Sequence, residues 1–108
     1  MFTEHSRGQI AKNLVHNFFI EKGCQVLVED TSQGLVDLAV INPENGKFVF
    51  VDVKCESQRT EGGANRRIYR TLKDSQKKLV EKTNIDIIIA YGNTSTKEVH
   101  ISNQQKIF

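Results

Sequence analysis

The chain has 108 residues, of which 38% are hydrophobic and 26% charged, and its net charge is +2. This length and composition are typical of one folded domain and exclude a disordered chain, while the nearly balanced charge identifies no partner. No apolar run approaches the about 20 residues that cross a membrane, and the N-terminus lacks the basic-then-apolar pattern of a signal peptide. We therefore expect a cytoplasmic protein with no membrane contact. Its 2 cysteines are too few for a disulfide framework or a four-cysteine zinc site.

The first predicted element is a helix over residues 6–22, because apolar side chains recur there at helical spacing. Ser6 is the predicted N-cap, and Gln9, three residues later, completes a capping-box pattern. Gly23 suits the C-terminal cap, where a left-handed backbone conformation is common. The helix is therefore bounded by a signal at each end.

Three strands are predicted next, over residues 25–29, 35–41 and 48–54. The second and third are apolar on both faces apart from a few charged residues, a pattern typical of central strands covered on both sides. The turn between these two strands contains Asn45-Gly46, a strong hairpin signal. We therefore expect the second and third strands to pair as an antiparallel hairpin.

The second half of the chain alternates polar and apolar segments. Residues 55–71 contain almost no apolar side chains and include Gly62-Gly63, so we expect a loop there. The later elements are predicted over residues 71–82 (helix), 85–91 (strand) and 98–102 (strand). The element order αβββαββ predicts an α/β fold with a mixed central sheet flanked by helices, formed by residues 1–108 as a single domain.

Charged residues interrupt the two most apolar predicted strands. Asp37 lies within the segment LVDLAVI, and Asp52 and Lys54 lie near the end of FVFVDVK. Burying an isolated carboxylate costs several kcal/mol unless it is paired, protonated or bound to a metal. A structural Asp–Lys pair is the simplest explanation, but it leaves the second aspartate unexplained.

The hairpin geometry brings the three charged side chains together. Asp52 and Lys54 are two residues apart and so share one face of their strand. A four-residue loop, 43–46, places Asp37 directly opposite Asp52, whereas a two-residue loop, 45–46, places Asp37 opposite Lys54. In both registers all three side chains share a face, whereas a loop of three or five residues would put Asp37 on the other face unless a bulge corrected it.

Two carboxylates in this arrangement are suited to bind Mg²⁺, which prefers oxygen ligands and retains several waters, and Mn²⁺ is an alternative. The main-chain carbonyl of Val53 is a candidate third ligand beside Asp37 and Asp52. Lys54 is placed to orient or deprotonate an attacking water and to offset the negative charge that develops on a phosphate. The predicted chemistry is therefore metal-assisted hydrolysis of a phosphodiester.

Asp37, followed by Asp52-Val53-Lys54 on a hairpin behind an N-terminal helix, resembles the PD-(D/E)xK nuclease superfamily. The resemblance covers residues 6–91 and is strongest to the small archaeal and phage Holliday-junction resolvases. It implies a restriction-endonuclease-like fold and a metal-dependent endodeoxyribonuclease that is selective for branched DNA. It also implies Asp37 and Asp52 as metal ligands and Lys54 as the catalytic lysine.

The sequence departs from the family pattern at two places. Val36 precedes the first aspartate, where the family name implies proline. Resolvase-like members also have a metal-binding glutamate on the first helix, whereas the candidate positions here hold Gln9 and Lys12. The resemblance thus assigns Gln9 to the catalytic site as an uncharged ligand of the metal or its water. Glu4 or Glu21 would replace it only if the helix had a different frame.

Basic residues are concentrated in one segment. Residues 54–82 contain nine basic and four acidic residues, so this segment is positive and the remainder of the chain negative. Arginine and lysine suit phosphate contacts, a tyrosine can stack on an unpaired base, and the resemblance implies a glutamine near the scissile phosphate. The alternative is a solvated loop and helix face. The candidate DNA-contacting residues are Arg59, Arg66, Arg67, Tyr69, Arg70, Lys73, Gln76 and Lys77.

Other functions remain open at this level. A homing, restriction-type or nicking endonuclease would use the same chemistry, and a catalytically degenerate DNA-binding module would retain only the fold. Because a two-fold dimer presents two sites to a two-fold substrate such as a four-way junction, we also expect a homodimer. Ile101, Ile107 and Phe108 are the candidate interface residues.

Overall fold

The computed structural model describes residues 4–29, 34–56, 58–61, 64–67 and 71–108, without the side chains of residues 4–6, 58–61 and 64–67. The described elements are α1 (Glu4–Glu21), β1 (Gln25–Val28), β2 (Leu38–Ile41), β3 (Phe48–Cys55), β4 (Gln58–Glu61), β5 (Ala64–Arg67), α2 (Asp74–Thr83), β6 (Ile87–Gly92) and β7 (Val99–Ile101), followed by the 3₁₀ turn η1 (Gln104–Lys106).

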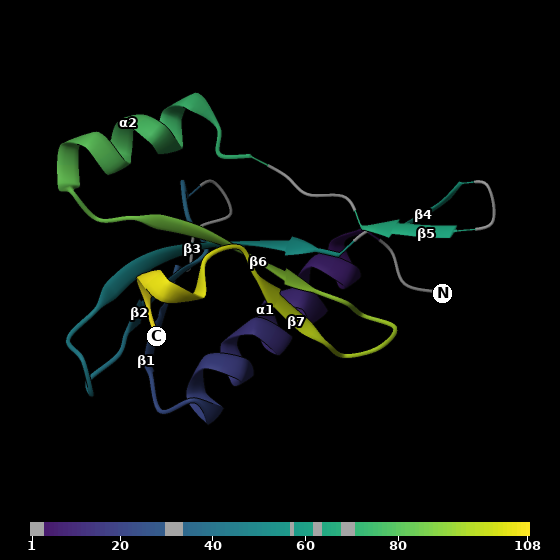
Figure 1. Ribbon diagram of the computed structural model, residues 1–108, viewed down its shortest axis with the longest axis horizontal. Helices are drawn as coiled ribbons and strands as arrows, with labels where there is room; N and C mark the ends of the chain where they lie inside the picture. The colour runs from purple at the N-terminus through teal and green to yellow at the C-terminus, as the bar shows by residue number, and fades with distance from the viewer. Residues whose placement is uncertain (1–3, 30–33, 57, 62–63, 68–70) are drawn as a thin grey trace.

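The fold is built on a five-stranded mixed sheet in the order β1-β2-β3-β6-β7. Strands β3 and β6 run parallel, and the other neighbouring pairs are antiparallel. Helix α1 packs on one face of the sheet and α2 lies over the other, while the β4–β5 hairpin extends beyond the end of β3 (Figure 1). The predicted α/β class with a mixed, helix-flanked sheet is confirmed.

Helix α1 begins earlier than the sequence indicated. Because it already includes Glu4, Ser6 lies inside the helix and the predicted N-cap is wrong. The C-terminal prediction is confirmed, since Gly23 has a φ of +87° and the Cys24 amide donates to the carbonyl of Phe19 at 3.0 Å. This left-handed residue turns the chain directly into β1.

The core lies between α1 and the sheet. Ala11, Val15 and Phe19 are fully buried at four-residue spacing, which places them on one face of the helix. They pack against alternate residues of β3, among them Val51 and Val53. Since successive strand residues point to opposite faces, Asp52 lies on the face away from α1.

The β2–β3 hairpin has the four-residue loop of the first predicted register. The Asn42 amide donates to the carbonyl of Lys47 at 2.8 Å, and Gly46 adopts a φ of +75° within the loop. Leu38 therefore pairs with Val51. The strand pairing ends at this pair, because the amide of Asp37 donates to the carbonyl of Val51 at 2.9 Å instead of continuing the ladder toward Asp52.

Two predictions for the neighbouring segments are wrong in detail. Strand β2 begins at Leu38 rather than at residue 35, because the chain bends away before it and the sheet pairing stops there. The segment predicted as a loop contains the strands β4 and β5, which pair antiparallel. A Gly-Gly pair between two polar strands is itself a hairpin signal, but the low apolar content concealed it.

The C-terminal residues belong to the core rather than to a dimer interface. Ile101 is buried and Ile107 has an exposed fraction of 0%, so the prediction that these two side chains form an exposed interface is wrong. The turn η1 folds the chain back, and the Asn42 side-chain amide donates to the Ile107 carbonyl at 2.9 Å. Phe108 alone of the three stays partly exposed, and its ring lies 6.1 Å from that of Phe19.

Among the described residues, neither helix combines the length and apolar character that a bilayer crossing requires.

Gly92 is expected to be intolerant of a side chain, because a Cβ there would lie 3.0 Å from both the Cα and the carbonyl oxygen of Ala11. Gly92→Ala should lower the free energy of unfolding by about 1–3 kcal/mol through overpacking of α1 on β6. Gly8→Ala is the matched control, since a Cβ at Gly8 meets nothing within 4 Å and alanine favours the helix by roughly 0.5–1 kcal/mol. Urea unfolding of both variants measures the difference, and equal effects would contradict the close packing.

Candidate active site

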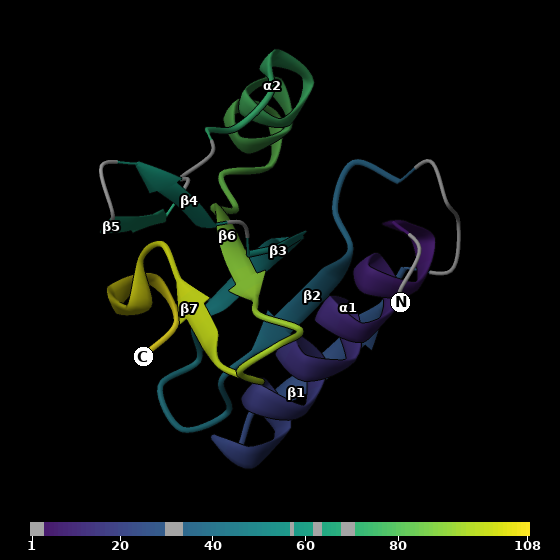
Figure 2. The ribbon, with the colours of Figure 1, turned by 90° about the vertical axis from the view of Figure 1, so that its right-hand side faces the viewer.

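The candidate site lies at the carboxyl end of β3, where this strand extends beyond β2. Asp52 and Lys54 are two residues apart in β3, and Asp37 immediately precedes β2. The β4–β5 hairpin follows directly from this end of β3 (Figure 2). Asp37 therefore lies at the end of β2 next to the part of β3 that carries Asp52 and Lys54.

Asp52 is a buried carboxylate with two donors. Its exposed fraction is 7%, and its Oδ2 accepts a hydrogen bond from Gln76 Nε2 at 3.0 Å and lies 3.5 Å from Lys54 Nζ. A buried charge needs such partners, because burial removes its hydration. Both contacts use Oδ2, and no donor among the described residues reaches Oδ1. This second oxygen is available to a ligand.

Asp37 is held differently, by the backbone of β3. Its Oδ2 accepts a hydrogen bond from the Val53 amide at 2.7 Å, and its own amide donates to the carbonyl of Val51 at 2.9 Å. The carboxylate thus takes the amide of β3 that a continuing β2 would have paired. Its other oxygen, Oδ1, lies 3.2 Å from Lys12 Nζ of α1. Asp37 therefore joins β3 to the first helix.

Gln76 connects α2 to both aspartate-bearing segments. Its side chain has an exposed fraction of 4%, and its Nε2 donates to Asp52 Oδ2 and to the carbonyl of Leu35 at 2.9 Å. Its Oε1 accepts from the amide of Lys73, the N-cap of α2, at 2.9 Å. Sequence reasoning placed Gln76 beside DNA and missed these contacts, because a single glutamine in a polar helix gives no sign of burial.

Lys12, rather than Gln9, is the α1 residue at the site. Gln9 is exposed, and its Nε2 lies 3.4 Å from Asn13 Oδ1. Glu21 is exposed at the last residue of α1, about 13 Å along the helix axis from Lys12 at 1.5 Å per residue. Sequence reasoning named both positions and assigned Gln9 to the site, because the rotation of α1 against the sheet, on which the choice depends, was not known.

The oxygen atoms available at this site can be compared with those that a magnesium ion requires. Asp37 and Asp52 would supply carboxylate oxygens, and Val53, between Asp52 and Lys54 in β3, would supply a main-chain carbonyl. In the part of the chain that the structure describes, no three His, Cys, Asp or Glu side chains group as a metal site would require. Two carboxylates fit Mg²⁺, which binds proteins through one or two such groups and keeps several waters. Two carboxylates are too few for a site in which the protein supplies every ligand of the metal.

The two cysteines have no part in this chemistry. Burial raises the pKa of the Cys24 thiol, so it stays protonated and unreactive. Cys55 follows Lys54 in β3, but its side chain packs against the core cluster on the opposite face. Neither thiol faces the carboxylates.

The predicted DNA-contacting residues separate into two groups. Lys73 and Lys77 are exposed on α2, whereas Gln76 between them is buried. Tyr69 and Arg70 lie outside the described residues. The side chains of Arg59, Arg66 and Arg67 are likewise outside the description, although their backbones are placed in β4 and β5.

Gln76→Ala should lower the free energy of unfolding by about 1–3 kcal/mol, because it removes a donor from buried Asp52 and leaves the Lys73 amide without its acceptor. Gln9→Ala removes the same side chain from an exposed helix position and should change stability by less than about 0.5 kcal/mol. Thermal or urea unfolding of the two variants compares them. A loss of stability in Gln76→Ala no larger than that in Gln9→Ala would contradict the role of Gln76 in holding Asp52 and the start of α2.

Comparison with known proteins identifies the fold but no family. No family model matches the chain, and no curated protein matches it. Among solved structures, the chain is similar to a bacterial homing endonuclease, I-Ssp6803I, with a TM-score of 0.63 and 16% sequence identity. The match covers 94% of this chain but 65% of the other, so the present chain spans less than two thirds of that neighbour. The mixed α/β fold described above is thus similar to that of an endonuclease.

Proposed function

We propose that this chain is a metal-dependent endonuclease that hydrolyses phosphodiester bonds of DNA. The observation that carries the proposal is the convergence of Asp37, Asp52 and Lys54 at the carboxyl end of β3. Two carboxylates on adjacent strands, with a lysine two residues beyond the second, match the motif of the PD-(D/E)xK nucleases. Assignment to that superfamily is part of the proposal. The fold similarity to a homing endonuclease supports the proposed nuclease activity independently of the motif.

The residues have separate roles in the proposed reaction. Asp37 and Asp52 hold Mg²⁺ or Mn²⁺, with the Val53 carbonyl as a further oxygen ligand. When bound, the metal lowers the pKa of a coordinated water and polarises the phosphate. Lys54 is 28% exposed beside Asp52, where its ammonium orients the attacking water and offsets the charge that develops on the phosphate oxygens. Gln76 keeps the Asp52 carboxylate in place.

Basic residues around the site support a nucleic-acid substrate. Arg59 of β4 pairs with Arg66 of β5 in the strand register. Lys73 and Lys77 add exposed positive charge on α2, the helix that contacts Asp52 through Gln76. These residues are proposed to bind the phosphate backbone, which positions DNA without reading its sequence.

Two substrate classes are compatible with this site. Branched DNA such as a four-way junction is the class implied by the resolvase resemblance, and a two-fold homodimer would present two sites to this two-fold substrate. A homing, restriction-type or nicking endonuclease is the alternative, and the fold of the chain is similar to that of a homing endonuclease. A catalytically degenerate DNA-binding module is the remaining possibility, because the helix positions where the resemblance implies a glutamate hold Gln9 and Lys12.

Cleavage assays test the proposal directly. The protein is incubated with Mg²⁺, with Mn²⁺ or with EDTA on four labelled DNAs: a four-way junction, a flap, a plain duplex and a single strand. Asp52→Asn should reduce metal-dependent cleavage by roughly a hundredfold or more, because it removes a ligand charge from the reacting centre. Asp86→Asn is the matched control, since the Asp86 side chain is half-exposed and pairs with Lys106 near the start of β6.

The pattern of products then identifies the substrate class. Symmetric cuts confined to the junction indicate a resolvase, whereas cuts at a defined duplex sequence indicate a homing-type enzyme. Absence of cleavage on every DNA in both metals, with binding intact, would exclude the nuclease and leave the DNA-binding module.

The double variant Lys73→Ala, Lys77→Ala should weaken binding to all DNAs to a similar degree. Its slope of log affinity against log salt should fall by about 2 units, since two phosphate contacts are lost. Lys106→Ala is the control, because this lysine pairs with Asp86 away from the site. Fluorescence anisotropy at several salt concentrations measures both slopes, and an unchanged slope for the double variant would remove α2 from the DNA interface.

A further inference from the structure

The two oxygens of the Asp37 carboxylate have unequal freedom. Oδ2 accepts the Val53 amide at 2.7 Å, and this amide belongs to the central strand β3. Releasing that bond would leave a backbone donor without its partner at the edge of the sheet, which is costly. A cation approaching Asp37 would therefore use Oδ1.

Oδ1 of Asp37 is already occupied by a cation of the protein. Lys12 Nζ lies 3.2 Å from it, and the side chains of Lys12 and Asp37 have exposed fractions of 41% and 23%. An ion pair this exposed contributes little stability, and lysine is a flexible chain with a point charge at its end. The ammonium can consequently leave Oδ1 at small cost.

Asp52 presents the opposite situation. Both of its donors, Gln76 Nε2 and Lys54 Nζ, contact Oδ2. Within the described residues its Oδ1 has no donor, so a cation could bind there without displacing a side chain. Of the two lysines at the site, only Lys12 occupies the oxygen that a metal would need.

We propose that Lys12 is an internal counter-ion that competes with the divalent cation for Oδ1 of Asp37, so that metal binding displaces the Lys12 ammonium from this carboxylate. The proposal rests on the proposed function, since it concerns the metal of the same site. With two carboxylates and two lysines, the site without metal has no net charge among these four groups. Its affinity for a divalent cation is then lower than two carboxylates alone would provide.

The test measures metal binding rather than cleavage. Mn²⁺ is titrated into the DNA-free protein and the free ion is followed by electron paramagnetic resonance. Lys12→Met should bind Mn²⁺ about tenfold more tightly than the wild type, because one positive charge a few Å from the metal has been removed. Lys12→Arg keeps the charge and should bind like the wild type.

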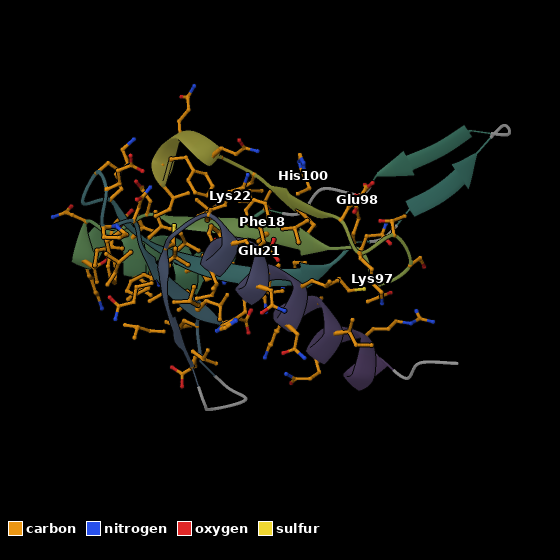
Figure 3. The ribbon with its side chains drawn as sticks, turned by 90° about the horizontal axis from the view of Figure 1, so that it is seen from below. Phe18, Glu21, Lys22, Lys97, Glu98 and His100 are labelled. Atoms are coloured by element: carbon orange, nitrogen blue, oxygen red, sulfur yellow. The ribbon has the colours of Figure 1, made fainter. Side chains whose placement is uncertain are left out.

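Lys22→Met is the matched control for the loss of a lysine. Lys22 follows the last residue of α1, and Figure 3 shows it near Phe18, whose ring centroid lies 5.6 Å from its Nζ. It is ten residues from Lys12, about 15 Å along the helix direction. The Mn²⁺ affinity of this variant should equal that of the wild type.

Thermal unfolding supplies a second readout. Without metal, Lys12→Met should have a Tm close to that of the wild type, because an ion pair this exposed contributes little stability. Saturating Mn²⁺ should then raise the Tm of Lys12→Met by more than it raises the wild-type Tm, because a ligand stabilises the protein according to its affinity. A purely structural role of Lys12 would lower Tm equally with and without Mn²⁺.

The outcomes separate this inference from the proposed function. If the wild type binds Mn²⁺ and Lys12→Met binds it no more tightly, the inference fails while the nuclease proposal stands. If neither protein binds Mn²⁺ or Mg²⁺, both fail. Tighter binding by Lys12→Met that is also seen in Lys22→Met would reflect net charge alone and would overturn the specific role of Lys12.

Discussion

The hydrogen bond from the Val53 amide to the Asp37 carboxylate is the interaction on which the candidate site depends. It lies where β2 ends and β3 continues, and it replaces a ladder bond with a bond to a charged side chain. Such bonds to ionised acceptors are stronger than those between neutral groups. The bond fixes the carboxylate against the backbone between Asp52 and Lys54, so that three functional groups from two segments keep one geometry without the surrounding loops having to hold it.

Each of the two carboxylates is also contacted by a side chain from one of the two helices, which lie on opposite faces of the sheet. Helix α2 reaches Asp52 through the buried side chain of Gln76, and α1 reaches Asp37 through Lys12. Asp52 is thereby rigid, with one oxygen accepting both donors, while Asp37 combines a fixed oxygen with an exchangeable one. The two aspartates share a motif, but their environments predict different behaviour toward a cation. A cation would bind Asp52 without displacing a side chain, whereas at Asp37 it would displace the Lys12 ammonium.

The fold class could be derived from the sequence and the hairpin register could be narrowed to two alternatives, because both depend on local chemistry; the structure has the one with the four-residue loop. The polar turn at 42–46 and the alternation around Asp52 determine which residues face one another. Strands β4 and β5 were not predicted because they are polar, whereas strands were predicted mainly from runs of apolar residues. The contacts of Lys12 and Gln76 could not be derived at all. They depend on the rotation of each helix against the sheet. The spacing of apolar residues does not define this rotation closely enough to place a single polar side chain.

The parallel pairing of β3 with β6 has a consequence for the order of folding. The β2–β3 hairpin joins neighbours along the chain, whereas Phe50 of β3 pairs with Ile87 of β6 only after a long connection has closed. Closure entropy makes such non-local pairing slow. The two aspartates can therefore meet early, in the hairpin. Gln76 lies on the connection itself, so Asp52 acquires its buried partner only when α2 docks and the late half of the sheet assembles.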